Sequence, residues 1–227
     1  MTARICVSIL PKNSLEALKL IKEAENAKAD LIEVRLDYLG TSRTFSDFVK
    51  ATKIPLIATN KLQTENGFFT GTETERQQIL LNAARSGFEY VDIELSSPKQ
   101  KEAINRLKSL GAKPIVSYHK FDGALNVSEM AKIFNEQVAV GADVCKIVTK
   151  AEKIEDNLTT LNFVASVSSK AKLVCFSLGE QGKLSRLLSP LFGGFFTFAS
   201  LEEGSETAMG QMTINQMRVV YDLLENK

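Results

Sequence analysis

The sequence predicts an α/β fold, a single (β/α)8 TIM barrel that spans residues 1–227. Strand-like and helix-like segments alternate along the chain, and parallel strands that are joined by helical crossovers need helices on their faces. Eight such pairs in 227 residues favour a closed barrel over an open doubly wound sheet. No GxGxxG motif follows the first apolar run, which disfavours a dinucleotide-binding fold.

The strands are expected at short, apolar, β-branched runs. In order, these runs are ARICVSIL (3–10), LIEVRLD (31–37), PLIATNK (55–61), YVDIEL (90–95), KPIVSYH (113–119), ADVCKIVTK (142–150), AKLVCFSL (171–178) and FFTFAS (195–200). The expected helices cover 14–28, 45–51, 74–85, 99–110, 127–140, 153–168, 184–191 and 213–225. Ser14 and Ser128 are typical of helix starts, and Gly87, Gly111 and Gly141 of helix C-caps.

Composition excludes several classes of partner. A net charge of +1 gives no reason to expect nucleic acid or an anionic membrane surface. Three cysteines, each inside an apolar run, indicate reduced core thiols in a cytoplasmic protein. The first residues lack the pattern of a signal peptide, and no apolar run approaches the length of a membrane span. A single histidine argues against a zinc or iron site, so no metal is expected.

Lys146 lies in the middle of the apolar run at 142–150. Side chains of a strand alternate between its faces, so Lys146 shares a face with Val144 and Val148. A buried ammonium is rare unless it is paired. One interpretation is an edge strand, or a lysine whose stem lies along apolar surface with its head in water. The functional alternative is a desolvated amine that forms a Schiff base with a carbonyl substrate.

Polar residues alternate with apolar ones near the C-terminal ends of several expected strands, where the active site of a barrel lies. Because the apolar face of each strand should meet the helices, the polar face should point inward. The inward-facing charged set is Glu33, Arg35, Asp37, Lys61, Asp92, Glu94, His119 and Lys146. Burying these charges is costly unless they pair with one another and with a polar ligand. For Asp37 and Asp92 a purely structural role, holding their neighbours, is the alternative.

His119 ends the strand that precedes the lysine strand, so we expect it beside Lys146 at the mouth of the barrel. Histidine ordinarily titrates near neutral pH, which suits repeated proton transfer. A solitary histidine is more often a core or surface residue, but its position here favours a general acid and base.

Several motifs occur in order along nearly the whole chain. They are EVRLD (33–37), TNKLQTENG (59–67), SYHKF (117–121), the lysine strand, LSR (184–186) and TAMGQ (207–211). Together they resemble type I 3-dehydroquinate dehydratase, the Schiff-base enzyme of the shikimate pathway. The resemblance implies a lyase of aromatic amino acid biosynthesis that converts 3-dehydroquinate to 3-dehydroshikimate without a cofactor.

The resemblance also implies a role for each matching residue. Lys146 would form the Schiff base, His119 would be the general acid and base, and Glu65 would orient His119. The residues implied in substrate binding are Ser8, Glu33, Arg35, Lys61, Arg186, Thr207 and Gln211. Arg186 would hold the substrate carboxylate with its two-pronged guanidinium. The polar loop at 201–211, which carries Thr207 and Gln211, would close over that end as a lid.

The chain departs from the family pattern at a few positions. Lys61 stands where arginine is usual, Asn66 replaces a glycine, and Thr207 replaces serine. Phe176 and Leu178 stand where bacterial members often have methionine. The sequence begins at the first barrel strand, so we expect a barrel floor that no N-terminal hairpin closes.

Two other functions are weighed against this one. A class I Schiff-base aldolase also uses a strand lysine, but most act on phosphorylated sugars and need a glycine-rich phosphate cradle. The loop at 178–183 offers only Gly179 and Gly182. A catalytically inactive barrel that serves as a binding protein should have lost one of the implied catalytic residues, and all are present.

The expected partner is a small-molecule substrate. Members of the family are often dimers, so a homodimer is also expected. The apolar residues that the outer helices can spare for an interface are Phe163, Val164, Val219 and Val220.

Overall fold

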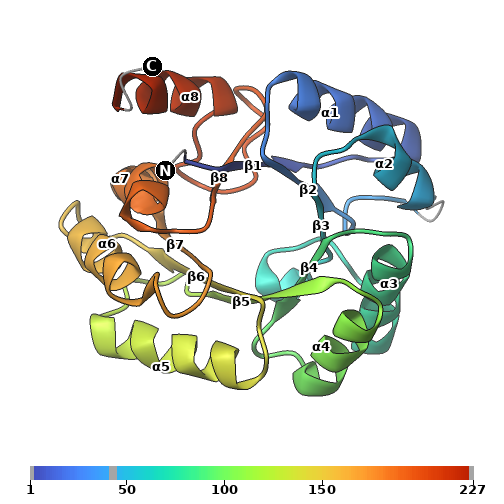
Figure 1. The fold of residues 1–227 in the computed structure, drawn as a ribbon, viewed down its shortest axis with the longest axis horizontal. Helices are drawn as coiled ribbons and strands as arrows, with labels where there is room; N and C mark the ends of the chain where they lie inside the picture. Colours follow the sequence, from blue (N-terminus) through green and yellow to red (C-terminus); the bar gives the residue numbers. More distant parts are fainter. Residues whose placement is uncertain (1–2, 41–44, 225–227) are drawn as a thin grey trace.

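Eight parallel strands form one sheet in the computed structural model, which describes residues 3–40 and 45–224 (Figure 1). The strands are β1 (Ile5–Ile9), β2 (Leu31–Arg35), β3 (Leu56–Thr59), β4 (Tyr90–Glu94), β5 (Lys113–His119), β6 (Val144–Lys150), β7 (Leu173–Leu178) and β8 (Thr197–Ala199). Each strand pairs with the next along the chain from β1 to β7, and β8 returns beside β1. Phe195 N donates to Leu173 O at 2.7 Å, which brings the β7 and β8 edges together. The sheet is therefore a nearly closed barrel, which confirms the predicted fold class.

Helices surround the sheet on its outer side (Figure 1). They are α1 (Ser14–Asn26), α2 (Phe45–Ala51), α3 (Glu73–Arg85), α4 (Gln100–Ser109), α5 (Val127–Ala139), α6 (Asp156–Val167), α7 (Lys183–Leu188) and α8 (Ile214–Leu224). Three short 3-10 turns accompany them: η1 (Gln63–Glu65), η2 (Glu180–Gly182) and η3 (Ser189–Phe192). No helix in the described ranges is long and apolar enough to cross a membrane.

The predicted helices differ from the observed ones mainly at their ends. The helix expected at 184–191 divides into α7 and η3, where Pro190 supplies no backbone N–H. The helix expected from 153 begins only at Asp156, whose carboxylate accepts from the backbone N–H groups of Glu152 and Lys153. The last residue of the helix expected at 213–225, Glu225, lies outside the described residues.

Asparagine side chains cap the two helices whose starts were expected at serines. The Asn13 side chain accepts from the first turn of α1, which begins at Ser14 as predicted. Asn126 forms a reciprocal capping box with Glu129 at the start of α5, so Ser128 is the second residue of that helix rather than its first. Serine and asparagine both cap well, so the residue type alone does not place a helix start to within one residue.

Glycines end three helices as predicted. Gly87, Gly111 and Gly141 have φ of +101°, +82° and +95°, a left-handed conformation that a residue with a side chain adopts at a cost. Each turns the chain back toward the next strand.

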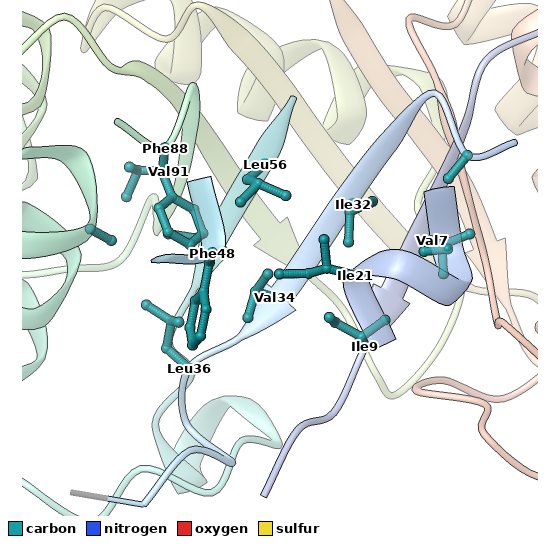
Figure 2. Packing of buried hydrophobic residues seen from close by; sticks show 14 of the residues in the cluster. Val7, Ile9, Ile21, Ile32, Val34, Leu36, Phe48, Leu56, Phe88 and Val91 are labelled. Atoms are coloured by element: carbon teal, nitrogen blue, oxygen red, sulfur yellow. The ribbon is translucent and has the colours of Figure 1, made fainter. Parts of the chain in front are cut away.

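Apolar side chains pack in two layers. The outer layer fills the space between the strands and helices, where Val34 of β2 meets Ile21 of α1 and Phe48 of α2 (Figure 2). The inner layer fills the lower part of the barrel, and alternation sends Leu31 and Ile57 there. All burial of this kind is driven by removal of apolar surface from water.

The barrel floor is closed by aromatic side chains at the N-terminal ends of the strands. The Phe195 ring lies near Tyr90 with 6.4 Å between centroids. The charged ends of Arg4 and Lys172 lie 4.7 and 4.9 Å from the centroid of the same ring. Cation–π contacts of this kind hold long cationic side chains over the floor.

The cysteine prediction is confirmed for burial, since Cys6, Cys145 and Cys175 are buried free thiols. The prediction that Phe163 and Val164 are spare surface residues was wrong. Both lie on the buried face of α6 and pack in the outer apolar layer.

Candidate active site

A pocket opens at the C-terminal ends of the strands, as expected for a barrel. All the predicted site residues except Ser8 line it, namely Glu33, Arg35, Lys61, Glu65, His119, Lys146, Arg186, Thr207 and Gln211. Ser8 is buried next to Glu33 in the pairing of β1 with β2, and its hydroxyl donates to the Glu33 carboxylate. The fold therefore brings together residues that lie as far apart in the sequence as Glu33 and Gln211.

Lys146 points into the lumen. Its strand pairs with β5 on one side and β7 on the other, and the residue is only 5% exposed. The Nζ atom donates to Asp92 Oδ2 at 3.0 Å and lies 4.5 Å from the centroid of the Phe198 ring. Glu33 Oε1 is 3.9 Å from the same nitrogen. The edge-strand and solvated-head interpretations are therefore excluded.

Lys61 lies beside Lys146 and is surrounded by oxygen atoms. Its Nζ is 2.8 Å from Asp92 Oδ1, 2.8 Å from Glu94 Oε1 and 3.0 Å from Ser117 Oγ. Burial works against its charge, but the two carboxylates prevail and raise the pKa of Lys61. Burial likewise opposes the charge of Asp92, yet Lys146 and Lys61 hold the pKa of that carboxyl well below its usual value.

Two further carboxylates are fixed by their neighbours. Glu33 accepts from Ser8 and, at 2.8 Å, from Thr59 Oγ1. Asp37 accepts two hydrogen bonds from the Arg35 guanidinium, at 2.9 and 2.6 Å. This bidentate pair holds Arg35 in the pocket wall, which confirms the neighbour-holding alternative for Asp37 as far as its contacts go.

His119 lies at the end of β5, partly buried, with its ring stacked on Phe121 at 5.7 Å between centroids. Burial lowers the pKa of His119 well below its ordinary value, and the positive charges of Lys61 and Lys146 lower it further. At neutral pH the imidazole is therefore uncharged and can accept a proton.

Glu65 does not contact His119 in this structure. Its Oε1 accepts from Ser96 Oγ at 3.4 Å, and burial raises the pKa of its carboxyl although Lys61 opposes the shift. The next residue, Asn66, has φ +56°, a left-handed conformation that asparagine tolerates better than most residues. The departure from glycine at Asn66 is therefore compatible with the same turn. At Gly67 a Cβ would meet Lys61 O at 2.1 Å, so only glycine fits.

Arg186 of α7 is a buried cation that has no anionic partner among the residues that the structure describes. It is 1% exposed, and its Nε and one terminal nitrogen have no hydrogen-bond partner within the described part of the chain. The guanidinium carbon lies 4.2 Å from the Phe176 ring centroid. Burial lowers the pKa of Arg186 to about 9. An unpaired guanidinium in a pocket wall is suited to bind a carboxylate or another oxyanion.

Thr207 and Gln211 lie on the loop that covers the Arg186 side of the pocket. Gln211 Oε1 accepts from Thr207 N at 2.7 Å and Thr207 Oγ1 at 3.2 Å. The loop contacts the strand-seven loop through Gly179 N, which donates to Met209 O at 3.1 Å. At Gly210, which has φ +74°, a Cβ would lie 2.2 Å from Gly179 O, so glycine allows this approach.

Sequence reasoning did not single out Phe198, which lines the pocket, or Arg76, which contacts the inward-facing charged set from outside. Phe198 lies against Lys146, and its inward position follows from alternation in FFTFAS. Arg76 of α3 reaches Glu94 at 2.7 Å from outside the barrel. The sequence feature that could have revealed Arg76 is its spacing: it shares one face of the helix with the buried residues Leu80 and Ala83.

The described residues contain no group of three or more His, Cys, Asp or Glu side chains that could hold a metal ion. The chemistry available is that of a buried amine, an uncharged imidazole and an unpaired guanidinium facing one pocket. This combination defines the class: a (β/α)8 barrel with a site suited to Schiff-base chemistry on a ketone.

The chain belongs to the type I 3-dehydroquinase family, whose model matches residues 5–227. It is 36% identical over 217 residues to the 3-dehydroquinate dehydratase of Dehalococcoides mccartyi, covering 96% of this chain and 94% of that protein. The 3-dehydroquinate dehydratase of Methanococcus maripaludis is 33% identical over 223 residues, 97% of this chain and 100% of its own length.

A crystal structure of the type I 3-dehydroquinate dehydratase from Clostridium difficile has a TM-score of 0.88. The match covers 99% of this chain and 93% of that one at 24% identity, a level that shows the fold alone. The family resemblance that was drawn from the sequence motifs is therefore confirmed.

Proposed function

We propose that this protein is a lyase of the shikimate pathway that dehydrates 3-dehydroquinate to 3-dehydroshikimate through an imine on Lys146. Membership of the family supports the reaction. The single observation that carries the mechanism is the position of Lys146, nearly dry and lumen-facing, at the base of the pocket that His119 and Arg186 also line.

In the proposed reaction, the Lys146 amine attacks the C3 ketone, His119 transfers protons through the resulting carbinolamine, and water leaves to give a protonated imine. The imine draws electrons from the adjacent carbon, so the C2 proton becomes acidic. His119, uncharged at neutral pH, removes that proton and then protonates the C1 hydroxyl as it leaves. Hydrolysis of the product imine frees Lys146 and releases 3-dehydroshikimate.

The substrate is held at both ends. Arg186 binds its carboxylate, and Thr207 with Gln211 closes over that end. Glu33 and Arg35 bind ring hydroxyls, with Ser8 and Asp37 fixing their orientation. Lys61 adds positive charge to the wall. Glu65, which lines the same pocket, orients His119 only once substrate has displaced its contact with Ser96.

The aldolase alternative has weaker support. The family that matches the chain is not an aldolase family, and the pocket offers the Arg186 guanidinium to an anion. The inactive-barrel alternative has no support from the site, because Lys146, His119, Glu65 and Arg186 all line the pocket. We further propose one barrel domain over residues 1–227, a cytoplasmic location and a homodimer.

The experiment is trapping of the imine. The protein is incubated with 3-dehydroquinate and sodium borohydride and is then digested. The mass of the peptide that contains Lys146 is measured by mass spectrometry. Wild-type protein should gain the mass of a reduced adduct on that peptide, and Lys146→Ala should lose both the adduct and turnover. Lys113→Ala, which removes a half-exposed lysine from the opposite end of the barrel, is the matched control and should trap normally. Dehydratase activity in Lys146→Ala would refute the mechanism.

A further inference from the structure

A chain of ion pairs runs from the outer helix α3 through the barrel wall to Lys146. Arg76 lies 2.7 Å from Glu94 Oε2, and Lys61 lies 2.8 Å from Glu94 Oε1. Lys61 is also 2.8 Å from Asp92 Oδ1, whose other oxygen is 3.0 Å from Lys146. Charges alternate in sign at every step, and Glu94 and Asp92 are each shared between two cations.

Arg76 is anchored at the outer end of this ion-pair chain. The residue is fully buried and donates to Asn60 O at 3.0 Å and to Ser97 Oγ at 2.7 Å. Two more of its hydrogen bonds go to the Glu73 carboxylate, at 2.6 and 2.8 Å. Glu73 is the one member that reaches solvent, with 22% of its side chain exposed. No part of Arg76 lines the pocket.

We infer that Arg76 is a positioning residue that sets, through Glu94, Lys61 and Asp92, the pH at which Lys146 becomes a nucleophile. The inference rests on the proposed function, because it assigns Arg76 a part in imine formation. Removing the charge of Arg76 leaves Glu94 with one cation instead of two. Glu94 then draws Lys61 toward itself, Asp92 is less neutralised, and Asp92 holds the Lys146 ammonium more tightly.

Lys146 also faces charged and titratable groups from other elements. These are Glu33 and Arg35 of β2, His119 of β5, Glu65 of η1, Arg186 of α7 and the Cys6 thiol of β1. None of these groups is among the partners of Arg76, which are Glu73, Glu94, Asn60 and Ser97. Substitutions at the outer end of the chain therefore leave these other neighbours of Lys146 in place.

The ion-pair chain predicts opposite effects from its two outer members. The rate of imine formation should rise with pH, and we call this rise the alkaline limb of the pH–rate profile. Arg76→Gln should move the midpoint of this limb to a pH about half a unit higher. At a given pH on the limb, this shift is roughly a threefold lower rate. Glu73→Gln frees Arg76 to hold Glu94 more strongly, so the same limb should move to lower pH by a smaller amount, since Glu73 is partly solvated. A merely structural role would lower activity in both variants without moving the limb in opposite directions.

The experiment measures the rate of imine trapping with 3-dehydroquinate and cyanoborohydride from pH 6 to 10. Arg76→Lys should restore most of the wild-type profile. Arg218→Gln is the matched control: it removes an arginine that pairs with Asp30 at 2.6 Å on the opposite end of the barrel, and its limb should not move.

The inference would be overturned if the limb had the same midpoint pH in wild type, Arg76→Gln and Glu73→Gln. It would also be overturned if both variants shifted the midpoint in the same direction. If Arg76→Gln does not fold, Glu73→Gln decides alone, and a limb that stays or moves upward overturns the inference. A wild-type protein that gives no trapped adduct would instead refute the proposed function, so the two failures are distinguishable.

Discussion

Two cations buried in the same pocket wall have opposite surroundings. Lys61, on the β3 and β4 side, has two carboxylates and a hydroxyl within 3.0 Å. Arg186, on the β7 and α7 side, has an aromatic ring below it and two nitrogens without a partner among the described residues. The surroundings raise the pKa of Lys61, whereas burial lowers the pKa of Arg186 to about 9.

This difference separates two uses of a buried charge. A cation that is fully paired contributes to the structure and to the electrostatic field of the site, because its donors are already committed. A cation that is buried without an anion costs stability in the free protein and regains it when an anionic ligand arrives. By this reasoning we propose that the substrate carboxylate binds Arg186 and that Lys61 acts on the reaction through Asp92.

Arg186→Leu should have the largest effect on catalysis. We expect kcat/KM to fall about 10³-fold, or about 4 kcal/mol, because the charge-assisted contact to the substrate carboxylate is lost. The free energy of unfolding should rise by about 1 kcal/mol, since an unpaired buried charge is removed. Steady-state kinetics and urea unfolding of the same preparation test both halves. A variant that is much less stable than wild type would show that Arg186 has a structural partner.

Lys61→Met should have the largest effect on stability. Asp92 and Glu94 would be left with one cation fewer, and breaking a buried pair costs about 3 kcal/mol of unfolding free energy. Lys113→Met is the control, because that lysine pairs with Glu89 at 2.8 Å but is 45% exposed, so its loss should cost less than about 1 kcal/mol. Equal losses of unfolding free energy in the two variants would mean that the ion pairs of Lys61 do not stabilise the fold more than an exposed pair does.

The pH dependence of stability reports how strongly Lys61 and Lys146 lower the pKa of His119. Burial, Lys61 and Lys146 lower its pKa in the folded state. Below about pH 6.5 the unfolded chain therefore binds a proton that the folded one does not, and stability falls as pH falls, by up to about 1.4 kcal/mol per unit. Because His119 is the only histidine, His119→Gln should flatten the unfolding free energy between pH 7 and 5.5. An unchanged slope would show that the folded-state pKa is not lowered.

Inorganic sulfate should show the smallest effect. At ten times its dissociation constant it should stabilise wild-type protein by about 1.4 kcal/mol, because it binds only the folded state. Arg186→Leu should gain nothing from sulfate, while Lys113→Met should gain as much as wild type. Thermal unfolding with and without sulfate is the measurement. A gain in Arg186→Leu would place the anion elsewhere.

Much of this molecule follows from local pattern. The alternation in ADVCKIVTK places Lys146 on the inner face, and the charged residues of LIEVRLD and YVDIEL follow the same rule. Helix ends were predicted less well: α6 begins at Asp156 rather than at 153, and α7 ends at Leu188 rather than at 191. Arg76 was missed because an arginine in a helix is usually solvated, and only the packed structure shows what it reaches.

The contact between His119 and Glu65 is an example of what the sequence pattern does not predict. The family resemblance implies that Glu65 orients His119, and the residues line one pocket, but in the structure Glu65 contacts Ser96 instead. That role therefore stays a proposal. Likewise, Lys61 and Arg186 carry the same charge, and the sequence does not indicate which of them is paired with carboxylates.

The sequence by itself determined the barrel, the inward direction of Lys146 and the set of residues around it, because strand alternation and the order of strands and helices are local properties. Tertiary structure decided which charges are paired. Ion pairing depends on distances of a few ångströms between residues tens of positions apart, and on how much water is removed around each one. Those quantities exist only after the eight strands have come together.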